Sequence, residues 1–119
     1  MSKIRVKVTI KNPEANISNE INAILQDDIL KYKENEDTTV VFSYKEKRLI
    51  RENNELRMDY IFKEKNESIG EILVKELNKK IKIDIKAKKI MIKEENIEII
   101  FDVEENEFIY KVEVIRWVY

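Results

Sequence analysis

The chain has no cysteine and no histidine, and its 119 residues include one glycine and one proline. Without cysteine there can be no disulfide framework, no thiol nucleophile and no thiolate metal site. Without histidine the chain lacks the commonest general base and the commonest zinc ligand, which excludes Ser-His and Cys-His catalysis. A metal site would need oxygen ligands alone, and no calcium loop of the D-x-[DN]-x-[DN]-G type occurs. We therefore expect no metal and no cofactor.

Long hydrophobic runs are also missing. The apolar stretches span three or four residues at most, and the first residues carry charges at alternate positions. This pattern fits neither a signal peptide nor a membrane span, so we expect a cytoplasmic protein with no membrane partner. Disorder is disfavoured, because the net charge is only -1 and 43% of the residues are hydrophobic. The length predicts a single domain over residues 1–119.

Alternation of apolar and polar residues fills most of the chain. Successive side chains of a strand point to opposite faces, so this alternation predicts strands with one buried and one wet face. We expect strands over residues 3–11, 38–46, 55–65, 79–93 and 107–119. Asparagine stands at the junctions where glycine is usual, and Asn53-Asn54 is expected to form a left-handed hairpin turn.

The alternation slips at three places, namely Asp27-Asp28, Lys88-Lys89 and Ile115. Two successive residues on the same side of a strand indicate a bulge or a sharp bend. Bends of this kind give a meander the curvature that a barrel needs. The pattern therefore predicts an all-β, antiparallel meander that closes, or nearly closes, into a barrel.

Residues 13–32 fit two interpretations equally well. Asn12-Pro13-Glu14 resembles a helix start, and Ile17, Ile21, Ile24, Leu25 and Ile29 have helical spacing. Alternation of Ile21, Ala23 and Leu25 favours a strand instead. Periodicity does not decide between helix and strand.

Four stretches resemble the YwiB-like bacterial proteins, a family of unknown function with a calycin-like (lipocalin-type) β-barrel. They are residues 19–47, residues 48–64 (RLIRENNELRMDYIFKE), residues 85–90 (IKAKKI) and residues 96–114. The resemblance implies a barrel of about eight to ten strands. It also implies a strand over residues 20–32, with a loop at 12–19. The chain differs from the family in having Gly70 as its only glycine.

An antiparallel barrel of this size encloses its own side chains or one small ligand. The candidate lining residues are those that share the inward phase with apolar neighbours, namely Tyr44, Tyr60, Tyr110 and Arg116. A buried Arg116 would need a carboxylate partner or an anionic ligand. In the alternative interpretation the strand changes face at Ile115, Trp117 packs inward and Arg116 is solvated. Tyrosines in such positions are also common core residues.

The other charged groups of the sequence form no candidate site. Asp27-Asp28, Glu94-Glu95 and Glu104-Glu105 are adjacent residues at expected turns, so they do not face each other across a cleft as glycoside chemistry requires. The lysines of residues 75–93 are followed by acids in the next strand, so a hairpin would neutralise them. Nucleic-acid binding is therefore disfavoured.

Three hypotheses of function follow. We favour a non-enzymatic barrel that binds a small apolar or anionic ligand, or a protein. The second hypothesis is an enzyme that uses carboxylates or tyrosines at the barrel mouth. The third is a structural module that forms a homodimer.

Overall fold

The computed structural model of the protein describes residues 2–64 and 67–118, with only the backbone of Val118. Within these residues there is no helix, and so none long and apolar enough to cross a membrane. The strands are β1 (Ser2–Lys11), β2 (Asn16–Gln26), β3 (Ile29–Lys33), β4 (Thr39–Ser43), β5 (Arg48–Glu52), β6 (Leu56–Ile61), β7 (Ile69–Val74), β8 (Lys79–Ile83), β9 (Ile85–Ile92), β10 (Asn96–Val103) and β11 (Asn106–Val118). The predicted all-β fold is confirmed, and its eleven strands slightly exceed the expected number.

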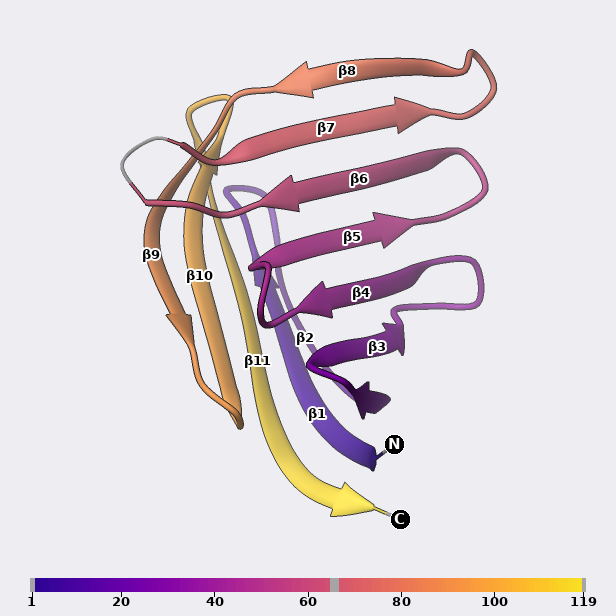
Figure 1. The fold of residues 1–119 in the computed structure, drawn as a ribbon, viewed down its shortest axis with the longest axis vertical. Helices are drawn as coiled ribbons and strands as arrows, with labels where there is room; N and C mark the ends of the chain where they lie inside the picture. The colour runs from indigo at the N-terminus through magenta and orange to yellow at the C-terminus, as the bar shows by residue number, and fades with distance from the viewer. Residues whose placement is uncertain (1, 65–66, 119) are drawn as a thin grey trace.

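The strands form one antiparallel sheet in the order β8-β7-β6-β5-β4-β3-β2-β1-β11-β10-β9. Because β1 pairs with both β2 and β11, the ring of hydrogen-bonded strands in the described residues is interrupted between β8 and β9 alone. These two strands meet at Asp84, where Ile83 pairs with β7 and Ile85 pairs with β10. Figure 1 shows that β3 to β8 run across the direction of β9, β10, β11 and β1. The meander is thus a nearly closed barrel with one open seam.

Residues 16–26 and 29–33 form two strands, and no helix occurs between residues 13 and 32, so the strand that the resemblance implies over residues 20–32 is divided in two. The strand β2 begins at Asn16, earlier than the expected residue 20, because its outward polar residues pair with those of β1. The Thr9 and Ser18 hydroxyls, for example, lie 3.0 Å apart. The Asp27-Asp28 slip is a hairpin turn between β2 and β3 and not a bulge within one strand.

The other two slips are β-bulges. In the pairing of β9 with β10, Ala87 lies opposite Phe101 and Lys89 lies opposite Ile100, so Lys88 is the extra residue. In the pairing of β1 with β11, the extra residue is Ile115. A bulge bends its strand and increases the local twist. Both predictions are confirmed, and the two bulges help the long strands of this layer to curve around the core.

Acidic residues occupy the left-handed backbone positions of two hairpins. Asp27 and Asp28 have φ of 51° and 64°, and Glu104 and Glu105 have φ of 49° and 71°. The expected left-handed turn at Asn53-Asn54 is wrong, because neither residue has a positive φ. The Asn53 side-chain oxygen instead accepts hydrogen bonds from the backbone N–H groups of residues 55 and 56. Asparagine forms this turn through its side chain.

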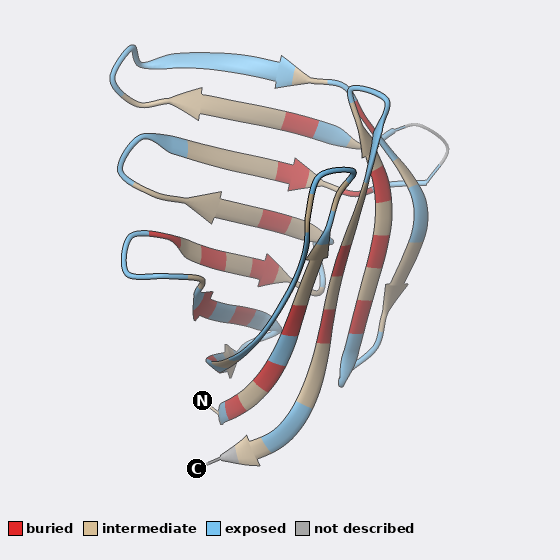
Figure 2. Cartoon of the chain, turned by 180° about the vertical axis from the view of Figure 1, so that it is seen from behind, coloured by how far each residue is buried: buried red, intermediate tan, exposed pale blue. Residues whose placement is uncertain are grey.

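The core lies between the crossing parts of the sheet, on the inward phase of the strands. Figure 2 shows buried residues in bands along the strands, and they alternate most clearly on β1, β3, β4 and β10. Ile85 is buried, Ile83 is half-buried and Ile81 is exposed, while Lys82 and Asp84 are exposed. The isoleucines of this segment thus lie on the inward phase, and their burial decreases from Ile85 to Ile81. The largest side chains that are completely buried are Phe42, Phe62, Ile4, Leu30, Ile97 and Ile99.

The substitution Glu105→Gly is expected to raise the free energy of unfolding by about 0.5 kcal/mol. The left-handed conformation costs a non-glycine residue about 1–2 kcal/mol, and the backbone entropy of glycine offsets about half of this. Urea unfolding measures the change. Asn54→Gly is the control, because Asn54 has no positive φ and should lose stability on the same change. Equal effects at the two sites would contradict the turn geometry.

The substitution Gly70→Ala is expected to lower the free energy of unfolding by about 1–2 kcal/mol. A Cβ at Gly70 would lie 3.0 Å from the Ile83 carbonyl oxygen and 3.1 Å from Ile85 Cγ2, at the corner where β8 meets β9. Without this crowding, alanine would be the more stable residue in a strand. Glu71→Ala on the opposite face is the control. An increase in the urea midpoint for Gly70→Ala would show that the corner is loosely packed.

Candidate functional site

A cavity of about 460 Å³ lies inside the barrel, and its lining comes from β1 to β6, from β10 and β11, and from the turns after β1 and β3. Its volume falls within the range of natural small-molecule sites. Most of the wall is apolar, and its apolar lining consists of Val8, Ile10, Ile17, Ile21, Val40, Leu49, Met58, Phe101, Val103, Phe108 and Ile109. The polar side chains of the lining are Asn12, Asn19, Tyr32, Glu34, Asn35, Arg51, Tyr60 and Tyr110.

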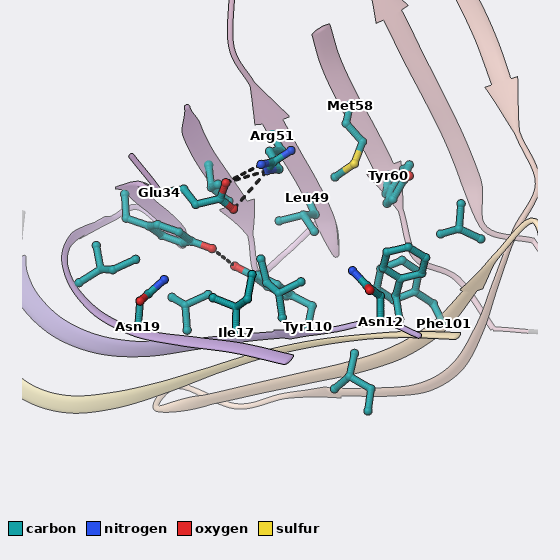
Figure 3. Close-up of a pocket in the computed structure, with 18 of the residues that line it drawn as sticks. Asn12, Ile17, Asn19, Glu34, Leu49, Arg51, Met58, Tyr60, Phe101 and Tyr110 are labelled. Atoms are coloured by element: carbon teal, nitrogen blue, oxygen red, sulfur yellow. Dashed lines mark hydrogen bonds and ion pairs between the residues drawn. The ribbon is translucent and has the colours of Figure 1, made fainter. Parts of the chain in front are cut away.

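An ion pair between Arg51 and Glu34 stands in this wall (Figure 3). Arg51 alternates with Leu49 on the inward phase of β5, and Glu34 directly follows β3. Arg51 Nη2 lies 2.5 Å from Glu34 Oε2, and Arg51 Nε lies 3.2 Å and 3.1 Å from the two carboxylate oxygens. The Glu34 side chain is 17% exposed and that of Arg51 is 42% exposed. The hydrogen bond to Glu34 raises the pKa of Arg51, so its charge is permanent.

A pair of tyrosines completes the polar part of the wall. The hydroxyl oxygens of Tyr32 and Tyr110 lie 2.8 Å apart, and both residues are buried. Burial raises the pKa of both phenols well above the usual range, so both stay protonated at neutral pH. Only one of the two hydroxyl hydrogens can lie in the shared bond, and the second can point into the cavity.

The structure separates the four residues that the sequence proposed for the interior. Tyr60 and Tyr110 line the cavity. Tyr44 does not: it is half-buried, its ring packs edge-on against Phe42, and its hydroxyl lies 3.5 Å from the carbonyl oxygen of residue 94. Burial raises the pKa of Tyr44 and that of Tyr60.

The placement of Arg116 in the interior is wrong. Arg116 is exposed, because the bulge at Ile115 reverses the phase of β11. Trp117 takes the inward position opposite Ile4 and packs against the core. Its indole Nε1 donates to the Glu95 carboxylate at 3.4 Å. The second interpretation of this strand end was therefore right.

Sequence reasoning missed three residues of the site: Tyr32, Glu34 and Arg51. A signal for Glu34 was present, because it continues the inward phase of Leu30 and Tyr32 at spacing two. The phase of Arg51 was ambiguous. Leu49 and Ile50 are adjacent and both apolar, so the sequence of β5 does not say which face is inward.

Charges outside the cavity mostly neutralise each other across strands. Lys88 lies 3.1 Å from Asp102 and 2.9 Å from Glu107, and Lys89 pairs with Glu98. The expected opposition of lysines and acids is confirmed for these two lysines. The pairs Asp27-Asp28 and Glu104-Glu105 lie at exposed hairpin tips. In residues 2–64 and 67–118, no three acidic side chains converge as a metal site would require.

The chain matches no family model, no curated protein and no solved structure.

Protein stability is expected to fall as the pH rises above about 10, where the tyrosines of the unfolded chain lose their protons. Because burial raises the pKa of Tyr32 and Tyr110, the folded chain holds these protons longer, and alkali favours the unfolded chain. The double substitution Tyr32→Phe/Tyr110→Phe should make this decline shallower. Tyr44→Phe, whose hydroxyl lies outside the pair, should change it less. Urea unfolding between pH 8 and 12 measures the slopes, and equal slopes for wild type and double variant would contradict the assignment.

Proposed function

We propose that the protein binds a small molecule with a largely apolar body and one polar end, and that it does so without catalysing a reaction. The observation that carries this proposal is the cavity of about 460 Å³ with apolar walls and one polar side. Convergence of a few polar groups in an apolar cavity is typical of ligand sites. Valines, isoleucines, tyrosines and phenylalanines surround this space, and their side chains leave it unfilled.

The apolar wall and the polar side of the cavity would contribute differently to the free energy of ligand binding. An apolar body that buries about 300 Å² gains roughly 7 kcal/mol at 25 cal/mol per Å². Association and immobilisation cost several kcal/mol of this. The apolar wall therefore supports weak binding by itself, and contacts with the polar side would raise the affinity and select the ligand.

The arrangement favours binding over catalysis. The carboxylate of the cavity, Glu34, is engaged on both oxygens by Arg51 and does not face a second carboxylate of the cavity lining. Tyr32 and Tyr110 stay protonated, so they donate hydrogen bonds but do not act as bases at neutral pH. These properties suit recognition of a ligand that offers acceptors.

A homodimer is a second candidate, favoured by the open seam of the sheet. The outer edges of β8 and β9 have no strand partner among the described residues. Lysines at both edges, together with the bulge at Lys88, oppose the pairing of edges. We therefore rank this candidate below ligand binding. We also propose that the chain belongs to the YwiB-like calycin family and that it is located in the cytoplasm. The barrel-shaped meander supports the family assignment.

Binding is tested with the neutral fluorophore 1-aminoanthracene, whose emission rises in an apolar environment. Met58→Trp adds bulk inside the cavity and should weaken dye binding at least about fivefold. Ile50→Trp is the matched control, because Ile50 lies on the outward phase of β5 and outside the cavity lining. It should leave the affinity unchanged.

The proposal fails if the wild-type protein gives no saturable rise in emission. It also fails if Met58→Trp and Ile50→Trp weaken the dye equally, because the dye would then bind somewhere other than the cavity. Circular dichroism of each variant confirms that the barrel is folded.

A further inference from the structure

The polar side of the cavity carries a positive charge whose donors are only partly used. Glu34 engages Nε and Nη2 of Arg51. The opposite edge of the guanidinium, formed by Nη1 and the second hydrogen of Nη2, makes no hydrogen bond within residues 2–64 and 67–118. Guanidinium edges of this kind bind carboxylates through two parallel hydrogen bonds. Arg51 can therefore receive a second anion while Glu34 stays in place.

Further donors stand in the same wall. One hydroxyl hydrogen of the Tyr32–Tyr110 pair is left over from their shared bond, and Tyr60 contributes another hydroxyl to the lining. Tyr32 is close enough to Arg51 and Glu34 for their charges to affect its titration. These donors share the lining with Arg51, whereas Glu34, the carboxylate among the described lining residues, is already paired. This balance favours a ligand with a negatively charged acceptor over one with a positive charge.

We propose that the cavity selects a monoanion with an apolar body, that its carboxylate or sulfonate binds the unused edge of Arg51, and that Glu34 limits its affinity. This inference rests on the proposed function, since it names the charge of the ligand for the same cavity.

Glu34 has two effects in this arrangement. It neutralises Arg51 within the fold, where an unpaired charge in an apolar wall would be costly. It also places a carboxylate beside the one that the ligand brings, and like charges on one guanidinium repel each other. Glu34 is therefore a residue that determines specificity: it admits anions that bind Arg51 strongly enough to overcome this repulsion. Its removal should strengthen the binding of anions and leave neutral molecules unaffected.

The test uses three competitors with the same naphthalene body, each displacing 1-aminoanthracene: 2-naphthoate, neutral 2-naphthalenemethanol and cationic 2-(aminomethyl)naphthalene. In the wild-type protein naphthoate should bind about fivefold tighter than the alcohol. Glu34→Gln should strengthen naphthoate about tenfold further and change the alcohol less than about twofold. Glu34→Gln/Arg51→Met removes both charges without leaving one unpaired, and it should abolish the preference while the dye still binds.

Arg48→Met is the matched control. It removes an arginine from the outward phase of the same strand, where Arg48 pairs with Asp59 at 2.5 Å, and it should leave the preference intact. The inference is overturned if naphthoate and the alcohol bind equally in the wild type, or if the cationic competitor binds tightest and loses this advantage in Glu34→Gln. Either result leaves the proposed function standing, because the dye still reports the cavity. Absence of dye binding overturns both.

Discussion

The pairing of the first strand with the last strand is the interaction on which the rest of the structure depends. The strand β1 lies between β2 and β11, so it joins the arm that runs from β2 to β8 with the arm that runs from β11 to β9. Ile4, Val6 and Val8 on its inward phase are buried at the centre of the core. Without this pairing each arm would expose an apolar face and a free edge. The bulge at Ile115 lets the two strands stay paired while they bend.

The cavity follows from the way these arms meet. The continuous chain through Asp84 holds β8 and β9 together at one corner, and there the large side chains Tyr60, Phe62 and Phe101 fill the interior. Near the hairpin ends of β3 and β5, the side chains of Tyr32, Glu34 and Arg51 leave space beside them. An ion pair in such a wall adds little stability compared with apolar residues of the same volume. This agrees with the role in ligand binding that we propose for Arg51 and Glu34.

Much of the fold could be predicted from alternation alone. Strands at the positions of β1, β4, β6 and β11 and the bulge at Lys88 followed from the spacing of apolar residues, whereas the change of face at Ile115 was one of two open interpretations. The spacing of apolar residues did not show that Asp27-Asp28 forms a hairpin turn, because aspartate in left-handed backbone has no sequence pattern of its own. The site was found in part. Tyr60 and Tyr110 lie on strands with a clear phase, whereas Arg51 lies on β5, where Leu49 and Ile50 obscure the phase. The contact of Glu34 with Arg51 depends on the pairing of β3, β4 and β5, which a local pattern does not fix.

The central claim is that the barrel holds a small molecule in its interior. Native mass spectrometry of the full chain, purified gently from its own host, tests this most directly because it reports bound molecules and oligomeric state together. The account predicts a monomer with an adduct of small-molecule mass that is lost on denaturation and ionises as an anion. A mass equal to that of the bare chain, alone or as a dimer, would contradict it.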